Sequence, residues 1–323
     1  MATNDKRLIV SEFDFDDVKN NLKTFLEAQD EFTDFNFEGS GISVLLDVLA
    51  YNTHYLGFNM NMLANEMFLD SSSLRSSVTS HAKTLGYEPA SARAPKAVID
   101  VTLFDSVKAT GSIPAGTVFT SSVNDVSYKF VTVNEFTASN SGNSIPFLSV
   151  PIYEGTFITT QYTVDSSDVD QRFVLTNNRA DTNTLTVTVQ TSATDTSSTT
   201  YTKTTDISQV TSTSANYFLQ EVENGLFEVY FGDGILGKSI SDGNIVVLTY
   251  VVTNRTDANT ATTFSNAAAI DTVVYVQVFT VEPASGGAFP ESVDSIKFNA
   301  PLDYAAQGRC VTVEDYKLFV KRF

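Results

Sequence analysis

The sequence is poor in the residues that bind metals, form disulfides or act as nucleophiles. It has one cysteine, Cys310, two histidines, His54 and His81, and no tryptophan. A single thiol excludes a disulfide framework within the chain and a cysteine-based metal site. Neither histidine has a nucleophile motif nearby or further ligands at metal-binding spacing. We therefore expect no catalytic residues, no bound metal and no cofactor.

Basic residues are scarce as well. There are 20 Lys and Arg against 38 Asp and Glu, which gives a formal net charge of −18. Nucleic acids and anionic membrane surfaces are bound by neutralising phosphates with Lys and Arg, so neither is an expected partner, whereas a basic protein is allowed. No apolar run is long enough to span a bilayer, and the first residues, MATNDKRLIV, lack the order of a signal peptide. These absences predict a soluble protein made in a cytoplasm.

What the sequence does contain begins with a helical zone at residues 1–92. Apolar residues from Phe15 fall on one face of a first predicted helix. A second run follows Gly39–Ser40–Gly41 and keeps helical spacing from Ile42 to Met67, and a third helix stops at Gly86. Tyr51, Tyr55 and Phe58 add aromatic surface to the second run.

These helices have apolar faces too wide for a bundle of three. One interpretation is a self-contained helical cap, because amphipathic faces are usually core; the other is an arm completed by helices from other chains. Two acidic clusters, at 12–17 and 27–38, fit a solvated face as well as a basic partner. The candidate interface residues are Phe15, Val18, Leu22, Phe25, Ile42, Leu45, Leu46, Leu49, Leu56, Met60 and Leu63.

From residue 93 to 283 the pattern changes to short Val, Thr, Phe and Tyr runs bounded by turn residues, which is typical of antiparallel strands. The Ser- and Thr-rich stretch 191–216 is expected to be a long loop or a weak edge hairpin. Residues 284–323 are expected to begin a C-terminal α/β region that continues beyond this chain. The predicted fold class is therefore α+β, with an N-terminal helical arm followed by β-sandwich-like domains.

Residues 232–239, GDGILGKS, match the phosphate-binding-loop pattern at every position. That loop must lead into a helix whose N-terminus holds the phosphates. Here Asp242–Gly243 turns the chain into the run IVVLTYVV, which predicts another strand. We therefore interpret Gly232, Asp233, Gly234, Gly237 and Lys238 as a structural turn, with Gly232 and Gly234 at positive φ, and expect no nucleotide binding.

Three segments resemble a known family. NYFLQEVENGLFEVYFGDGILGKSISDGNIVVLTYVVTN (216–254) is similar to the signature of the baseplate J-like family, which builds the baseplates of contractile phage tails and related injection machines. Residues 14–94 resemble more specifically the baseplate wedge proteins of T-even-type phages. ESVDSIKFNAPLDYAAQGRCVTVEDYK (291–317) resembles a later family motif, which we assign to Pro301, Arg309, Thr312, Asp315 and Tyr316; Cys310 stands where alanine is expected.

The resemblance implies a structural role in the virion and no catalysis. Family members pair as dimers and join into a sixfold ring around the tail tube, and their N-terminal helices bundle with other wedge subunits. It favours the partner-completed arm, with a second copy and other wedge subunits as partners. Alternatives are the equivalent subunit of a phage-derived injection system and a host-surface adhesin suggested by the Thr-rich β zone. The lack of tryptophan counts against the adhesin.

Overall fold

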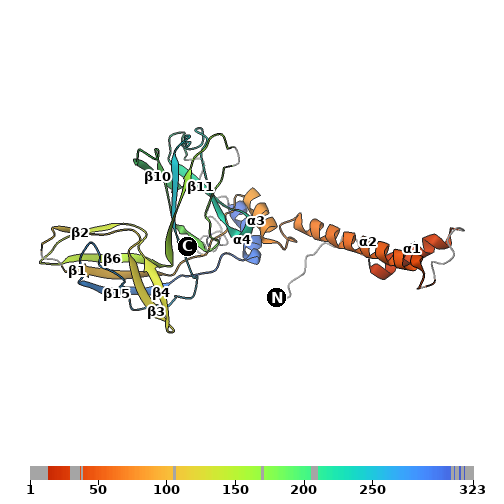
Figure 1. Cartoon of the computed structure of the whole chain (residues 1–323), viewed down its shortest axis with the longest axis horizontal. Coiled ribbons are helices and arrows are strands. Elements are labelled where there is room, and N and C mark those ends of the chain that lie inside the picture. Colours follow the sequence, from red (N-terminus) through yellow and green to blue (C-terminus); the bar gives the residue numbers. More distant parts are fainter. Residues whose placement is uncertain are drawn as a thin grey trace. The chain divides into compact units, whose positions relative to one another are not determined.

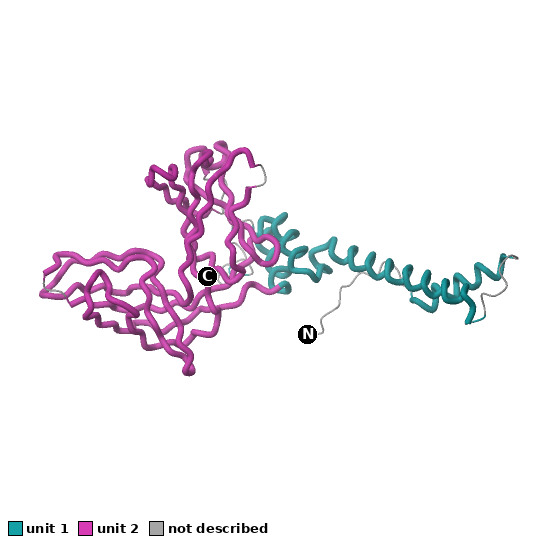
Figure 2. The backbone as a smooth tube through the Cα atoms, in the orientation of Figure 1, with its two compact units in different colours: residues 1–87, 293–323 teal, residues 88–292 magenta. Residues whose placement is uncertain are grey.

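The computed structural model describes residues 14–29, 37, 39–104, 107–168, 171–204, 210–306, 309, 313 and 316. The chain forms two compact units, one from residues 1–87 together with 293–323 and one from residues 88–292 (Figure 2). Helices build the first unit, and mostly antiparallel strands build the second (Figure 1). This confirms the predicted α+β class, while the predicted boundaries after residues 92 and 283 remain predictions.

In its described part, the first unit has four helices with defined bounds. They are α1 (Phe15–Glu27), α2 (Gly41–Glu66), α3 (Arg75–Thr84) and α4 (Val293–Ala306). The Ser40 side chain caps α2 by accepting the Ser43 N–H at 3.0 Å. The 26 residues of α2 run without a break, which confirms the predicted long helix and gives it a length of about 39 Å.

A small core joins α3 to α4. Val78 and Ala82 of α3 are buried with Ile296 and Ala300 of α4. Partly buried Leu69, Leu85, Tyr87 and Val293 pack around them. Residues 293–306 therefore belong structurally with the N-terminal helices, although more than 200 residues separate them in the sequence.

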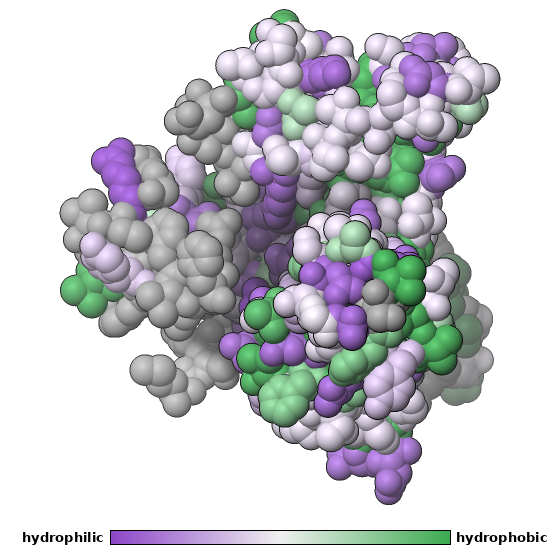
Figure 3. Space-filling view, turned by 90° about the vertical axis from the view of Figure 1, so that its left-hand side faces the viewer, coloured by the Kyte–Doolittle hydropathy of each residue, from purple (hydrophilic) through white to green (hydrophobic). Residues whose placement is uncertain are grey.

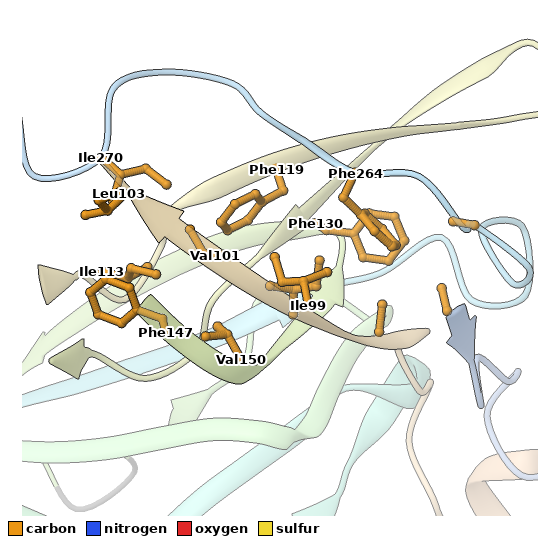
Figure 4. Close-up of a cluster of buried hydrophobic side chains, with 14 of the residues drawn as sticks. Ile99, Val101, Leu103, Ile113, Phe119, Phe130, Phe147, Val150, Phe264 and Ile270 are labelled. Atoms are coloured by element: carbon orange, nitrogen blue, oxygen red, sulfur yellow. The ribbon is translucent and has the colours of Figure 1, made fainter. Parts of the chain in front are cut away.

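The second unit begins with a six-stranded sheet in the order β14-β3-β4-β6-β1-β15, in which every pair is antiparallel. Its strands are β1 (Lys96–Leu103), β3 (Val118–Val123), β4 (Val126–Val131), β6 (Ile145–Glu154), β14 (Ser265–Asn266) and β15 (Val276–Ser285). A separate pair is β2 (Thr110–Ile113) with β5 (Phe136–Ser139). Alternate residues of β1, from Ala97 to Leu103, enter a core that includes Phe119, Phe130 and Phe264 (Figure 4).

A seven-stranded sheet follows in the order β7-β13-β9-β10-β11-β12-β8. Its strands are β7 (Thr156–Thr163), β8 (Phe173–Val174), β9 (Ala180–Gln190), β10 (Ser198–Lys203), β11 (Asn216–Glu221), β12 (Phe227–Phe231) and β13 (Ile245–Val252). A 3₁₀ turn, Glu223–Gly225, joins β11 to β12. Fully buried Leu175, Leu248 and Tyr250 lie in its core.

The expectation of a long loop or a weak edge hairpin in the Ser- and Thr-rich stretch 191–216 is only partly right. It does form a hairpin with β9, but β10 lies between β9 and β11, and its pairing with β11 is parallel, so it is not an edge strand. Tyr201 is the buried residue that anchors it. Sequence reasoning missed this because β10 presents a single large apolar residue to the core.

The two large sheets meet at a polar junction. One residue, Gly155, connects β6 of the first sheet to β7 of the second, with φ +134°. The buried Glu154 carboxylate accepts hydrogen bonds from the Thr253 hydroxyl at 2.8 Å and from the Asn254 N–H at 2.9 Å. Asp181 is also buried and accepts the Ala94 N–H at 2.8 Å. Side-chain acceptors thus satisfy backbone groups where strands change sheet.

Candidate partner-binding helices

The glycine motif forms a tight turn between two strands. Asp233 Oδ1 accepts the N–H groups of Ile235 and Leu236, both at 2.9 Å, and these backbone hydrogen bonds hold the pKa of Asp233 below its usual value. Gly234 and Gly237 both have φ of +89°. Lys238 donates its N–H to the Ser214 carbonyl at 2.8 Å, and the chain then enters β13. The predicted strand–turn–strand geometry is confirmed, without the helix that a phosphate loop needs.

The predicted positive φ at Gly232, the first glycine of the motif, is wrong. Its φ is not positive, in contrast to those of Gly234 and Gly237. A Cβ atom on Gly232 would lie only 2.1 Å from the carbonyl oxygen of Leu236. Glycine is therefore required here because two backbone segments lie close together, and not because the backbone is left-handed.

The first two helices form a hairpin in which α2 turns one narrow face to α1. The buried residues of α2 are Ser43, Leu46, Ala50 and Gly57, α1 contributes buried Val18, and the two helices pack against each other. An ion pair between Lys19 and Asp47 lies at the same contact. Two candidate interface residues, Val18 and Leu46, thus belong to this intramolecular contact, and Phe15, Leu22 and Ile42 are half-buried.

The other predicted interface residues are uncovered. Phe25 is exposed on α1, and α2 carries a leucine stripe, defined as Leu45, Leu49, Leu56, Met60 and Leu63. Leu63 is 68% exposed and Leu49, which is the least exposed of the five, is still 45% exposed. A soluble monomer rarely exposes so many large apolar side chains together, so the stripe is a candidate binding surface.

A second exposed stripe on α2 is absent from the predicted interface. This aromatic stripe consists of Val44, Val48, Tyr51, Tyr55, Phe58 and Met62. Its members recur at steps of four and three residues, and Tyr51 stacks on Tyr55 with ring centroids 6.4 Å apart. At 3.6 residues per turn the aromatic and leucine stripes lie roughly 120° apart. The sequence shows this stripe as a second set of apolar residues at helical spacing, next to the set from which the interface was predicted.

Charge is nearly absent from α2. Its only charged residues are Asp47, which pairs with Lys19, and Glu66 near its end. Glu66 accepts the N–H and the hydroxyl of Ser73 at 2.8 and 2.7 Å. Desolvation raises the pKa of Glu66, but its hydrogen bonds to Ser73, Ser77 and Leu74 outweigh this and leave the pKa below its usual value. A helix that is apolar on all sides is normally a buried helix.

Exposed apolar residues also occur outside the two stripes of α2. Phe104, Val107, Val274 and Tyr275 lie where β1 and β15 meet their loops, and the rings of Phe104 and Tyr275 are 5.2 Å apart. An ion pair of 2.8 Å between Lys108 and Asp271 stands in the same loops. Figure 3 shows hydrophobic and hydrophilic side chains mixed over the face that it displays. The two stripes of α2 are the larger candidate surface.

The C-terminal motif is only partly visible. Pro301 lies inside α4, Arg309 donates its N–H to the Ala306 carbonyl at 2.9 Å, and Tyr316 is exposed. Thr312 and Asp315 lie outside the described residues. Their assignment stays a prediction.

The residues that could bind metal are dispersed in the described part of the chain. Within that part, no group of three or more His, Cys, Asp and Glu side chains is placed to hold a metal ion. His81 Nε2 lies 2.9 Å from the Glu66 carbonyl oxygen, which gives it a structural contact between α3 and the end of α2. Among the described helices, none is long and apolar enough to cross a membrane.

The helical segment is similar to a known family of proteins. Residues 14–87, which contain α1, α2 and α3, match the family model described as "Baseplate wedge protein gp6-like, helical domain". The chain is 30% identical to the "Baseplate wedge protein gp6" of Enterobacteria phage T4, in an alignment over 335 residues that covers 95% of this chain and 49% of the relative. The resemblance to the baseplate wedge proteins of T-even-type phages is thereby confirmed. The chain spans about half the length of this relative.

Two solved baseplate structures align more weakly. One is the TssK–TssF–TssG baseplate subcomplex of the type VI secretion system, with a TM-score of 0.39 and 9% identity over 87% of this chain and 81% of the other. The other is the anti-feeding prophage baseplate, with a TM-score of 0.33 and 12% identity over 98% of this chain and 66% of the other. At these TM-scores neither alignment establishes a common fold.

Proposed function

We propose that this chain is a structural component of the baseplate wedge of a contractile phage tail and has no enzymatic activity. One observation carries the proposal: α2, with two uncovered apolar stripes, lies inside the segment 14–87 that matches the wedge helical-domain family. The similarity to a phage baseplate wedge protein over 95% of this chain supports the same role.

The leucine and aromatic stripes are the means of assembly. Burying one Leu or Phe side chain contributes about 1.5–3 kcal/mol, so the eleven residues of the two stripes can stabilise a large helical bundle. Because α2 has only two charged residues, partner helices can cover it without burying unpaired charge. Acidic residues on α1, such as Asp16 and Asp17, form the rim that sets register with a partner.

In the assembled virion the chain would act as a mechanical joint. It would form dimers, bind other wedge subunits through its helices, and contribute to a ring around the tail tube. That ring would couple host contact to sheath contraction. Assembly would take place in the host cytoplasm before the chain becomes part of the tail baseplate.

Two other roles use the structure differently. A phage-derived injection system would use the same helical surface, and the same variants would disrupt it. A host-surface adhesin would instead place its binding site on the strands and leave α2 without a function. The apolar α2 therefore favours assembly over adhesion, and selective binding to a glycan array would reverse that preference.

Co-expression with the products of adjacent genes, followed by analytical ultracentrifugation, tests the proposal. We expect a discrete hetero-oligomer with more than one copy of this chain. Leu63→Asp and Tyr55→Asp should each reduce its yield strongly, because an unpaired charge would be buried at the interface. Leu148→Asp is the matched control, since Leu148 is 73% exposed on β6 of the other unit.

Circular dichroism of each variant must show wild-type helix content, because the expected defect lies in assembly. A purified chain that remains a monomer with every adjacent gene product would contradict the proposal. So would hetero-oligomers that form equally well with Leu63→Asp and Tyr55→Asp.

A further inference from the structure

Residues 67–74 join α2 to α3, and this connection contains no glycine and no proline. Hydrogen bonds within it fix its shape. The Ser72 N–H donates to the Phe68 carbonyl at 2.9 Å, and the Ser72 hydroxyl donates to the Leu69 carbonyl at 3.1 Å. Ser72 is fully buried, and the Leu69 side chain packs against the core that α3 forms with α4. The connection is therefore ordered by buried contacts, in contrast to a flexible linker with an exposed backbone.

The start of α3 is anchored by a side chain of α2. Leu74 stands at the N-cap position of α3, and its apolar side chain cannot accept backbone N–H groups. The carboxylate of Glu66, the last residue of α2, accepts the Ser73 N–H at 2.8 Å, the Ser73 hydroxyl at 2.7 Å and the Leu74 N–H at 3.3 Å. Hydrogen bonds to an ionised carboxylate are strong, and negative charge is favourable near a helix N-terminus.

The end of α2 is bonded in turn by a side chain of α3. The last turn of α2 has no basic residue, and its final carbonyl groups have no partner within the helix. His81 Nε2 lies 2.9 Å from the Glu66 carbonyl oxygen. Because a carbonyl oxygen only accepts, Nε2 is the donor in this bond. Each helix thus supplies a polar side chain to the end of the other, and Glu66 takes part in both contacts.

The contacts of Glu66 connect α2 to a packed core, because α3 and α4 bury apolar residues against each other. The α4 helix also reaches the connection directly, since Lys297 Nζ lies 3.3 Å from the Asp70 carbonyl oxygen (Figure 1). A hinge requires a few backbone positions that are free to change φ and ψ. Here α2, α3 and α4 all hold the positions at which such a change would have to occur.

We propose that Glu66 and His81 fix the orientation of α2 relative to the α3–α4 core, so that the helix and the core move as one rigid body. A force that a partner applies to α2 then reaches the core without bending at residues 67–74. This inference rests on the proposed function for its purpose, because rigid coupling matters in an assembly that moves. It deepens that role by naming the two positioning residues at a joint that does not bend.

Distances between two spin labels on the full chain test this rigidity. In a Cys310→Ala background the labels are attached at Asn52→Cys on α2 and Ser80→Cys on α3, both at exposed positions. Asn52 lies about 21 Å along the helix axis from Glu66, so bending at the connection would displace it far. Dilution with unlabelled chain restricts the measurement to distances within one molecule. We expect a single narrow distance distribution.

Removing either contact should widen that distribution. We expect Glu66→Ala and His81→Ala each to broaden it at least twofold. Glu66→Gln keeps an acceptor oxygen and His81→Gln keeps an N–H donor, so both should stay closer to the wild type. Glu27→Ala is the matched control and should not change the width, because Glu27 is likewise the last residue of its helix, α1, but is exposed. Circular dichroism checks that each variant retains the helix content of the wild type.

Two results would overturn the inference. The first is a broad distribution in the wild-type background, which would show free bending at residues 67–74 and does not depend on the folding of any variant. The second is an unchanged width in both Glu66→Ala and His81→Ala, which would place the source of the rigidity elsewhere. Assembly is measured separately by ultracentrifugation, so either result would leave the proposed function standing.

Discussion

The Thr253 hydroxyl donates a hydrogen bond of 2.8 Å to the Glu154 carboxylate, and both residues are fully buried. Glu154 ends β6 and Thr253 follows β13, so this bond links the six-stranded sheet to the seven-stranded one. Asn254 adds two further donors to the same carboxylate, at 2.9 Å from its N–H and 2.7 Å from its amide. The junction is therefore held by polar groups at the point where the chain crosses between sheets.

Replacing Glu154 should weaken this junction. Glu154→Ala leaves the buried Thr253 hydroxyl and the partly buried Asn254 donors without this acceptor, and we expect a loss of about 3 kcal/mol in the free energy of unfolding. Urea unfolding, followed by tyrosine fluorescence or by circular dichroism, measures this loss. Glu282→Ala, at an exposed position of β15, is the control and should change the free energy little. Equal stability of the two variants would contradict this role.

Gly155 should tolerate no side chain. Its φ is +134°, and a Cβ would lie 2.3 Å from the Val252 carbonyl oxygen. Gly155→Ala should therefore lower the midpoint of thermal unfolding markedly. Gly142→Ala is a matched control, because Gly142 also has positive φ but nothing lies within 4 Å of its Cβ position. A larger drop for Gly142→Ala would show that the close contact at Gly155 does not matter.

Leu46 and Leu56 should separate folding from assembly. Leu46 is 5% exposed against α1, so Leu46→Ala should destabilise the helical hairpin by about 2–3 kcal/mol. Leu56 is 57% exposed, so Leu56→Ala should leave hairpin stability near that of the wild type and weaken complex formation. Thermal melting by circular dichroism reports the first effect, and sedimentation of the co-expressed complex reports the second. The opposite pattern would place Leu56 in the intramolecular core.

Asp181 should make stability depend on pH. Its burial raises its pKa above the ordinary value of 3.8, and this outweighs the hydrogen bonds from Ala94 and Asn183. The folded chain then binds more protons than the unfolded chain between pH 3.8 and the raised pKa, so this group makes stability fall as pH rises through that window. Above the raised pKa the loss is complete.

Asp181→Asn tests this because it cannot titrate. The free energy of unfolding, measured by urea denaturation from pH 4 upward, should vary less with pH in the variant than in the wild type, with the difference confined to that acidic window. Asp195→Asn serves as a control, because Asp195 is exposed and hydrogen bonds to Ser197 lower its pKa. Identical pH profiles for wild type and Asp181→Asn would show that Asp181 does not cause the pH dependence of stability.

Much of the architecture could be predicted where the pattern is local. The run from Ile42 to Met67 gave α2 nearly to the residue, and Asp242–Gly243 correctly indicated a strand after the glycine motif. The candidate partner surface was predicted only in part, because Tyr51, Tyr55 and Phe58 were noted as aromatic surface and left out of the predicted interface. Burial decided which apolar residues belong to the hairpin: Val18 and Leu46 do, and Leu49 does not.

Other features could not be predicted from the sequence. The packing of α4 against α3 joins residues more than 200 positions apart, and no local periodicity reports such a contact. The place of β10 inside its sheet depends on pairing with β11, although its own residues have only one strong anchor, Tyr201. Gly232 is required by the nearby Leu236 carbonyl, a distance that appears only after the turn has closed.

The sequence by itself determined the helices, most strands, the absence of a phosphate loop and the scarcity of charge on α2, because each follows from neighbours within a few residues. Only the tertiary structure decided which face of α2 is already covered and which two faces are free. It also decided how Glu154, Asp181 and Gly155 hold the two sheets together. These outcomes depend on contacts between distant segments, whose free energies are set by burial and by hydrogen-bond geometry after folding.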